Sequence, residues 1–546
     1  MNATRDVIKT SINNRSSPIR LATVCLIGLL VAASATVRLP FFNTQPLWVD
    51  EAISWWYTQY TIDELWSSVP RFETHPPYYY LLLKGWSSIW GQSEASLRGL
   101  SSLASIVTTL AMYFAGLALG GPDVAFVAAL IYALSPIHVK YAHEARPYAL
   151  MCFGLSVALA GSLSFFRTGY PLKPGLQADF MQNALATSAY SKRLPWRHWV
   201  AITTGSVILL WMHNISILYV ATLFAALLLC IIAFDQENEI KCWRPIKALF
   251  ASGVIVFLVF MPQLGWFFSQ SRQVLSDFWI ERPTFQDVWL SFTEISGFSS
   301  LWMPYGLPLL WQAFATIALA GVFIIGIIAL RRDGQVQALL LLGSIAILPV
   351  LLILGISIFI RPIFLTRVVI ASGIPYVLIA SYGLTRLRPG LVRWAAYSTI
   401  LLLLCKSLLG FFATTEKEPW DQVAAYLEAN ADKGDLILTV PNYAALPLQY
   451  YGSPILLEML VPLPAPYPAT GQNARYPSNR GAPAINSSHE SDIMRIIDRA
   501  SSLFLVTRRY DLYDPDSIVK GIIQAKKKMV LCRDFKHSIV VYLFKT

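Results

Sequence analysis

The sequence predicts a polytopic α-helical membrane protein of about eleven spans with a C-terminal α/β domain. Of its 546 residues, 55% are hydrophobic and only 14% are charged, whereas a soluble protein carries about 25% charged residues. Apolar stretches close to the roughly 20 residues that cross a bilayer recur up to residue 412. Beyond that point charge returns and apolar runs shorten to strand length. These observations exclude a purely soluble protein and a disordered one.

A transmembrane module over 21–412 follows a polar N-terminal segment, 1–20. The apolar run that starts at Leu21 has no clear small-residue cleavage site, so we predict a first span and not a removed signal peptide. The predicted spans are 21–37, 99–119, 122–138, 147–166, 199–212, 214–234, 248–268, 307–330, 336–359, 368–384 and 395–412.

Basic residues collect in four connecting loops, which are 167–198, 235–247, 331–335 and 385–394. Because short cytoplasmic loops are enriched in Lys and Arg, we predict that these loops and the N-terminus are cytoplasmic. The protein would then be a multi-pass protein of the inner (plasma) membrane, and an odd number of spans places its C-terminal domain outside the cytoplasm. The net charge of +11 follows from this bias, so we predict no nucleic-acid partner.

Three predicted outer segments, 38–98, 139–146 and 269–306, interrupt the module. The first, 38–98, is rich in Trp and Tyr and contains a short apolar run at 77–90. That run predicts a helix lying in the membrane interface, where aromatic residues settle. If it crossed the membrane instead, every later segment would change sides and the basic bias would worsen. The second outer loop, 139–146, is a short turn between two spans.

The C-terminal segment, 413–546, predicts a small α/β domain outside the cytoplasm. Its predicted strands are Leu436–Val440, Leu503–Val506 and Ile539–Phe544, and its predicted helices are 420–430 and 516–527. Residues 461–490 are dense in Pro, Ser, Asn and Gly, which predicts a mobile loop. The chain has six cysteines without CxxC spacing, so neither a zinc site nor a disulfide framework is indicated.

The adjacent carboxylates Asp50 and Glu51 follow the first span, inside the aromatic outer loop. A carboxylate held at the outer face can take a proton from a hydroxyl or ligate a hard metal ion. Such a pair is more often a solvated loop or the acidic start of a helix. The pair alone therefore does not establish a site.

His75 stands before Pro76-Pro77, at the entry to the predicted interfacial helix. It can donate a hydrogen bond to a phosphate or a sugar, or it can act only as a capping or packing histidine. The second outer loop gathers further polar residues in one turn: Lys140, His143, Glu144, Arg146 and Tyr148. Charge this dense beside a bilayer is unfavourable unless it is paired or functional. An interface anchor with an Arg–Glu pair is the alternative, and we favour a function because the turn shares its predicted side with Asp50.

Two arginines, Arg361 and Arg367, stand at the outer end of a span. Guanidinium groups bind phosphate oxygens bidentately, whereas the alternative is an arginine that snorkels to lipid head groups. Taken together, the motifs supply acids for a hydroxyl or a metal, cations for a phosphate, and aromatic rings for a sugar. This combination favours a substrate with a sugar-phosphate head and a lipid tail.

The four motifs resemble the GT-C superfamily of membrane glycosyltransferases, over nearly the whole chain. The nearest branch contains bacterial relatives of protein O-mannosyltransferases and of the aminoarabinose transferase of lipid A. The motifs are Asp50-Glu51, His75-Pro76-Pro77, His143 to Tyr148 and Arg361 to Arg367. The stretches Trp420 to Ala424, Gly434-Asp435 and Pro441 to Tyr443 also resemble the outer domain of this branch.

The resemblance implies a polyprenyl-phosphate-linked sugar donor and an acceptor at the extracytoplasmic face, which is a protein, a glycolipid or a polysaccharide. It implies that Asp50 is the catalytic acid–base residue, with Glu51 beside it and Glu144 as the second-loop carboxylate. Some relatives bind a divalent metal ion between the loop carboxylates and others do not, so an ion held by Asp50 and Glu144 stays open. We expect the leaving phosphate to be bound by cationic and polar residues, namely His75, Lys140, His143, Arg146, Tyr148, Arg361 and Arg367.

Other functions compete with this hypothesis. A lipid-linked saccharide flippase would need polar residues at mid-depth in its spans, whereas here the ionisable residues lie at loops and span ends. A membrane-anchored binding protein would act through 413–546. Oligosaccharide transfer or polymerisation by a GT-C fold is a further alternative. The sugar, the acceptor and the oligomeric state are not determined by the sequence.

Overall fold

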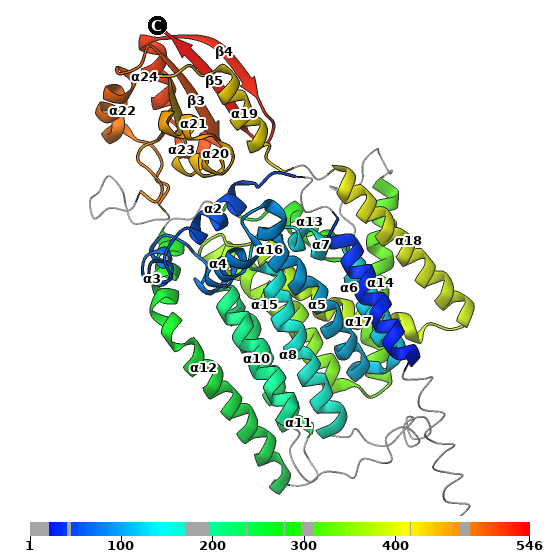
Figure 1. The fold of residues 1–546 in the computed structure, drawn as a ribbon. Coiled ribbons are helices and arrows are strands. Elements are labelled where there is room, and N and C mark those ends of the chain that lie inside the picture. The colour runs from blue at the N-terminus through cyan, green and yellow to red at the C-terminus, as the bar shows by residue number, and fades with distance from the viewer. Residues whose placement is uncertain are drawn as a thin grey trace, which may run out of the picture.

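The protein, described by a computed structural model, is a helical bundle that carries a small α/β domain at one end (Figure 1). The structure describes residues 21–40, 45–169, 196–234, 239–276, 280–297, 309–414, 417–469 and 481–546. The predicted N-terminal segment 1–20 and most of the predicted loop 167–198 lie outside these residues. We call the end of the bundle that bears the α/β domain the domain end.

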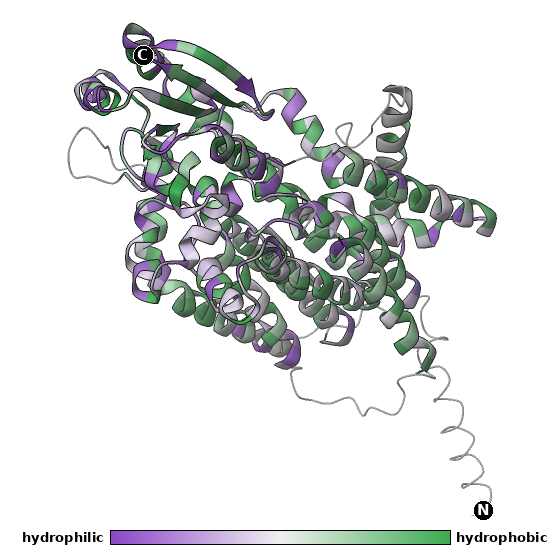
Figure 2. Ribbon diagram, turned by 45° about the horizontal axis from the view of Figure 1, so that its top comes forward, coloured by the Kyte–Doolittle hydropathy of each residue, from purple (hydrophilic) through white to green (hydrophobic). Residues whose placement is uncertain are grey.

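The long helices of the bundle correspond to the predicted spans. They are the first helix Leu21–Arg38, α5 (Glu94–Gly120), α6 (Pro122–Leu134) with α7 (Pro136–Ala142), α8 (Tyr148–Gly169), α10 (Trp196–Met212), α11 (Ser216–Phe234), α12 (Glu239–Ser276), α14 (Leu309–Arg332), α15 (Val336–Phe359), α17 (Gly373–Arg386) and α18 (Gly390–Thr414). In the described part of the chain, eight helices are long and apolar enough to cross a membrane, or nine when α6 and α7, bent by 58°, count as one span. Figure 2 shows that hydrophobic residues dominate these helices.

The prediction of 248–268 as a span underestimates α12, which has 38 residues. At 1.5 Å per residue this helix is about 57 Å long, well beyond the roughly 30 Å of the hydrocarbon core. The helix is therefore longer than one crossing requires, and its last turns lie at the domain end (Figure 1). There Gln270 donates from Nε2 to the carbonyl oxygen of Glu73, over 2.6 Å. The extension thus ties the bundle to the first outer loop.

The first outer loop folds into short helices that lie across the domain end: α2 (Val49–Thr58), α3 (Ile62–Ser67) and α4 (Tyr78–Trp90). The apolar run at 77–90 forms α4, whose 13 residues span about 20 Å, too short to cross a bilayer. α13 (Phe285–Ile295) and the short helix α16 (Thr366–Val369) complete this end. α2 lies between the bundle and the α/β domain (Figure 1).

The C-terminal domain contains a five-stranded sheet in the order β2-β1-β3-β5-β4. β1 pairs in parallel with β2 and β3, whereas β5 pairs antiparallel with β3 and β4. The strands are β1 (Leu436–Val440), β2 (Leu460–Pro462), β3 (Ser502–Arg508), β4 (Lys528–Asp534) and β5 (Ile539–Lys545). The helices are α19 (Trp420–Asn430), α20 (Ala445–Tyr451), α21 (Pro454–Met459), α22 (Glu490–Ile497), α23 (Tyr510–Tyr513) and α24 (Ile518–Lys526).

Side-chain alternation along the strands separates two cores. On one face Ile437 and Phe504 pack with Trp420 and with Val49 of α2. On the other face Leu438 and Leu505 pack among residues of α22 and α24. The domain therefore buries part of the first outer loop within its own core.

The predicted mobile loop 461–490 is more ordered at its edges than expected. β2 occupies its start, and Leu463 and Ile485 are buried. Apolar side chains within a Pro- and Ser-rich stretch can still pack onto a neighbouring sheet, which composition alone does not indicate. Residues 470–480 of this segment lie outside the described residues.

A glycine allows two helices of the bundle to approach closely. Gly326 of α14 faces the backbone of Ile379 in α17, and a Cβ atom there would overlap the Ile379 carbonyl oxygen. We expect Gly326→Val to lower the free energy of unfolding by about 1–3 kcal/mol through overpacking. Thermal unfolding in detergent measures this change. Gly321→Ala in the same helix is the control, because a Cβ atom at Gly321 meets nothing within 4 Å. Equal melting temperatures of the two variants would contradict the close contact.

Candidate active site

Two cavities lie at the domain end, where the bundle meets the α/β domain. The large cavity has a volume of about 1150 Å³ and the small cavity about 360 Å³. Trp48 and Arg367 line both of them. The two cavities therefore adjoin at these side chains, and a group placed beside Arg367 can be approached from either cavity.

The large cavity has one apolar wall and one polar end. The apolar wall consists of Ile217, Leu218, Phe267, Leu275, Ile356 and Ile360 from α11, α12 and the end of α15. The polar part of the lining holds six residues that the sequence analysis singled out: Asp50, His75, Arg146, Tyr148, Arg361 and Arg367. The α/β domain contributes Tyr443, Tyr467 and Arg508. A ligand with an apolar tail and a polar head fits this division.

The small cavity is rich in charged side chains. Four cationic side chains line it, namely Arg98, Lys140, Arg367 and Lys417. His143 and Glu144 of the second outer loop face it as well, together with Phe411 and Phe412 at the end of α18. An anionic or hydroxyl-rich group fits this lining.

Asp50 stands in the first turn of α2 and faces the large cavity. Its Oδ2 lies 3.2 Å from Nη1 of Arg367. The side chain of Asp50 is 24% exposed, and among the described residues Arg367 is its only side-chain partner. The second carboxylate oxygen is therefore available to a ligand, beside the one cation that both cavities share.

Glu51 is fully buried, although it is the neighbour of Asp50. Arg98 donates to both of its oxygens, from Nε and Nη2, over 2.8 Å each. Lys417 Nζ donates to Oε2 over 2.8 Å, and the backbone N–H of Ala145 donates to Oε1 over 3.0 Å. Burial would raise the pKa of Glu51, but the charges and hydrogen bonds of Arg98 and Lys417 outweigh it and lower that pKa to about 2. Glu51 lines neither cavity, so the expected catalytic role gives way to a structural one.

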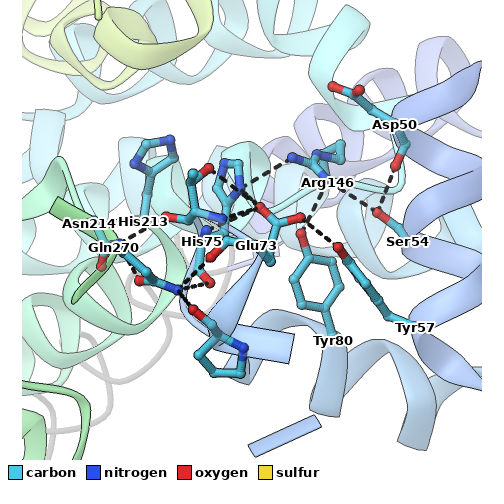
Figure 3. A network of polar contacts seen from close by, with 12 residues as sticks. Asp50, Ser54, Tyr57, Glu73, His75, Tyr80, Arg146, His213, Asn214 and Gln270 are labelled. Atoms are coloured by element: carbon cyan, nitrogen blue, oxygen red, sulfur yellow. Dashed lines mark hydrogen bonds and ion pairs between the residues drawn. The ribbon is translucent and has the colours of Figure 1, made fainter. Parts of the chain in front are cut away.

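His75 and Arg146 belong to a buried polar network around Glu73 (Figure 3). Oε1 of Glu73 lies 2.6 Å from Nδ1 of His75, and Nη1 of Arg146 donates to the hydroxyl of Tyr80 over 3.1 Å. Burial and the charge of Arg146 lower the pKa of His75. His75 is therefore neutral near pH 7. Its Nδ1–H is directed to Glu73. His75 can therefore orient neighbouring groups, but it supplies no positive charge to a phosphate.

Arg146 connects this network to the helix of Asp50. Figure 3 shows its guanidinium between Ser54 of α2 and His75. The distance from Nη1 to the Ser54 Oγ is 3.5 Å, and that from Nη2 to the His75 Nδ1 is 3.3 Å. Arg146 is 5% exposed, and it lines the large cavity. It is thus a fixed cation near Asp50.

The second-loop residues separate into two groups. His143 donates from Nε2 to the backbone oxygen of Arg38 over 2.8 Å, and burial lowers its pKa to about 3. A neutral imidazole committed to a carbonyl is a poor phosphate ligand, so the expected binding role of His143 is not supported by its geometry. Lys140 is 3.8 Å from Glu294 and faces the small cavity. Glu144 is buried beside it, and burial raises its pKa.

The carboxylates that could hold a metal ion face different spaces. Asp50 lines the large cavity, whereas Glu144 lines the small one. In the described ranges no group of three or more His, Cys, Asp or Glu side chains is close enough to hold a metal ion. The Asp50–Glu144 pair thus does not by itself provide a complete set of metal ligands.

Comparisons with known proteins agree with this arrangement. Residues 74–169, which hold His75, Glu144, Arg146 and Tyr148, match the family model described as dolichyl-phosphate-mannose-protein mannosyltransferase. The structure is similar to that of ArnT from Cupriavidus metallidurans in the apo state, with 13% sequence identity and a TM-score of 0.58, over 96% of this chain and 98% of that chain. ArnT bound to undecaprenyl phosphate is similar with 15% identity and a TM-score of 0.57, over 95% and 97% of the two chains.

The chain shares the fold of ArnT over nearly its whole length. This confirms the predicted resemblance and the predicted fold class. The archaeal oligosaccharyltransferase AglB from Archaeoglobus fulgidus, in complex with an inhibitory peptide and a dolichol-phosphate, is also similar, with 11% identity and a TM-score of 0.51, over 95% of this chain and 74% of that chain. No sequence among the curated proteins matches at a significant level.

Several residues of this candidate site were not predicted from the sequence. They are Glu73, Arg98, Lys417, Glu418 and Arg508. Arg98 stands where an apolar span begins, and a charge at such a position is a signal of function or pairing. Lys417 and Glu418 belong to the charged linker that follows the last span. Arg508 ends a strand of the α/β domain, and nothing in the sequence connects it to Asp50.

The buried position of Glu51 predicts a pH effect on the stability of the fold. The pKa of Glu51 is about 2 in the folded protein and about 4.3 in an unfolded chain. Its stabilising contribution is therefore complete above about pH 4.3 and is lost as the pH falls toward 2. We expect Glu51→Gln to lower the free energy of unfolding by about 3–5 kcal/mol at pH 7, because Arg98 and Lys417 lose their anion. The difference from wild type should shrink on acidification.

Melting temperatures of wild type and Glu51→Gln between pH 7 and pH 3 measure both effects. Asp63→Asn is the control, since Asp63 is a solvent-exposed carboxylate of the same outer loop. A difference between wild type and Glu51→Gln that stays constant with pH would contradict the ionised, buried state of Glu51.

Proposed function

We propose that the protein is a glycosyltransferase that moves a sugar from a polyprenyl-phosphate donor to an acceptor hydroxyl at the extracytoplasmic face of the inner membrane. The observation that carries this proposal is the Asp50–Arg367 pair at 3.2 Å, in the place where the apolar-walled cavity and the cationic cavity adjoin. One member of the pair can accept a proton and the other can stabilise a phosphate. Both groups are needed when a hydroxyl displaces a lipid phosphate from a sugar.

The chemistry follows from the positions of the two groups. Asp50 accepts the proton of the acceptor hydroxyl while the hydroxyl oxygen attacks the anomeric carbon of the donor. The bond between that carbon and the phosphate oxygen breaks, and its electron pair stays on the polyprenyl phosphate. Attack from the face opposite the phosphate inverts the anomeric configuration. Arg367 and Arg146 stabilise the leaving phosphate, because both are cations that line the large cavity, Arg146 buried and Arg367 partly exposed.

The donor lipid fits the large cavity. Its apolar lining comes from the ends of α11, α12 and α15, which suits a polyprenyl tail, and Arg361 and Tyr148 line the same cavity. The undecaprenyl phosphate bound to ArnT and the dolichol-phosphate bound to AglB support a lipid phosphate as the ligand class. The acceptor, whether protein, glycolipid or polysaccharide, would reach Asp50 from the other side of Arg367.

A divalent metal ion is a separate proposal. Asp50 and Glu144 are the carboxylates that would hold it, and a bound ion would stabilise negative charge on the phosphate. The steps above are performed by the side chains of the chain itself.

Asp50→Asn should leave a folded protein whose turnover falls by about 10²–10⁴-fold, the usual effect of removing a general base. The measurement is release of polyprenyl phosphate from a panel of radiolabelled polyprenyl-phosphate sugars, with protein purified into lipid nanodiscs. Asp63→Asn is the matched control, because Asp63 is an exposed carboxylate of the same outer loop. Wild-type turnover by Asp50→Asn would contradict the assignment of Asp50 as the base.

Arg367→Gln should reduce turnover by about 10²–10³-fold, because a preorganised donor to the leaving phosphate is lost. Arg367→Lys should recover part of this loss, since it keeps the charge but not the bidentate geometry. The same release assay measures both variants. Arg331→Gln, at an exposed arginine at the opposite end of α14 from the site, should behave as wild type. Equal activities of Arg367→Gln and wild type would show that the phosphate is held elsewhere.

A further inference from the structure

The helix that carries Asp50 is not capped by its own N-cap side chain. The N-cap residue of α2 is Trp48, whose side chain makes no capping hydrogen bond. The first backbone N–H groups of a helix lack partners within the helix and need acceptors from elsewhere. Here the N–H of Val49 donates to Oε2 of Glu418 over 3.2 Å, across 369 residues of sequence. A carboxylate from the C-terminal linker thus takes the place of a local cap, where the helix dipole favours a negative charge.

Glu418 is itself held by the α/β domain. Its Oε1 accepts hydrogen bonds from Nε and Nη2 of Arg508, over 2.8 Å and 2.6 Å. Its Oε2 also accepts from Nε1 of Trp420, over 2.8 Å. Arg508 is oriented in turn by the hydroxyl of Tyr443, which accepts from Nη1 over 3.0 Å. Glu418 is 7% exposed, so this carboxylate has one fixed position.

Apolar packing fixes the same turn of α2 from the side. Val49 is 1% exposed and Ala52 is fully buried, and both belong to the core that Trp420 and Val423 of α19 build. Successive helical residues are about 100° apart around the axis. One face of the first turn therefore packs into the α/β domain, while Asp50 is directed to Arg367 of the bundle.

We infer that Glu418, held by Arg508, is a positioning residue: it caps α2 from the α/β domain and so sets the place of the Asp50 carboxylate against Arg367. The inference rests on the proposed role of Asp50 as the base. Arg508 also lines the large cavity, so the group that orients the cap borders the ligand space. The α/β domain is then a working part of the transfer site and not only an appendage that selects acceptors.

The first test is Glu418→Gln in nanodiscs, with the release assay described above. The variant keeps the size of the side chain but loses the charge that pairs with Arg508 and faces the helix N-terminus. We expect kcat to fall about 10- to 100-fold, because a small misplacement of a catalytic group has effects of this size. KM for the donor should stay within about threefold, because Glu418 does not touch the lipid-binding wall. Asp498→Asn is the matched control, since Asp498 forms an exposed pair with Lys526 in the same domain.

A double variant separates positioning from general destabilisation. If Glu418 acts through Asp50, adding Glu418→Gln to Asp50→Asn should not lower the residual turnover any further. If Glu418 only stabilises the fold, the two losses should multiply, and this result would overturn the inference. Tyr443→Phe is a milder variant in case Glu418→Gln does not fold: it removes only the hydroxyl that orients Arg508. It should lower kcat in the same direction by about 2- to 10-fold, and wild-type kcat in Tyr443→Phe would count against the inference.

We call the capping of α2 by Glu418 the clamp. Hydrogen exchange tests the clamp in an experiment that does not depend on turnover. Amides at 49–55 of α2 should exchange faster in Glu418→Gln than in wild type, while those of the sheet strands β1 and β3 should not change. If these amides exchange faster while the wild type shows no activity toward any donor, the clamp is supported and the proposed function is rejected. Unchanged exchange over 49–55 would overturn the clamp whatever the activity.

Discussion

The structure of the domain end depends on one buried carboxylate, Glu51. A carboxylate without solvent is very unfavourable unless charges and hydrogen bonds replace its water. Arg98 supplies two hydrogen bonds, Lys417 supplies one and the amide of Ala145 supplies another. These partners come from a membrane span, the C-terminal linker and the second outer loop. None of these segments can move away without leaving a charge unpaired, so the cluster fixes the frame in which both cavities form.

The contrast between Glu51 and Asp50 follows from helix geometry. The two residues are neighbours in the first turn of α2, and a step of about 100° turns one toward the bundle interior and the other toward the large cavity. The buried residue is saturated with partners, whereas Asp50 keeps one ion pair and an accessible oxygen. Structural and chemical roles are thus divided between two adjacent acids. Figure 3 shows Ser54 of the same helix beside Arg146, which lies next to His75.

The sequence predicts those parts of the molecule that depend on local pattern. Apolar runs locate the spans, and strands β1, β3 and β5 are predicted because their side chains are buried in alternation or in a run. β4 is not predicted, because it is an edge strand whose residues are all exposed. β2 has three residues, too few for any periodicity. The length of α12 is underestimated because its last turns are polar.

The candidate site is predicted only in part for a similar reason. Asp50, Arg146 and Arg367 can be singled out because charge beside a bilayer is unusual, and the structure brings all three to the large cavity. The sequence does not indicate which of Asp50 and Glu51 faces that cavity, since this depends on the pitch of α2 and on Arg98. Nor does it connect Glu418 or Arg508 to α2, because contacts across hundreds of residues leave no periodic signal. His143 has the right chemistry for a ligand but is committed to a backbone carbonyl.

The distance along the chain between Val49 and Glu418, 369 residues, has a consequence for biosynthesis. A ribosome completes α2 early, when the linker and the sheet that cap it do not yet exist. Throughout translation the helix therefore emerges with its first turn unsupported, and it acquires its final geometry only when the last strands have folded. A truncated chain that lacks the linker and the sheet would have α2 without this cap. The final geometry of α2 is in this way conditional on synthesis of the α/β domain.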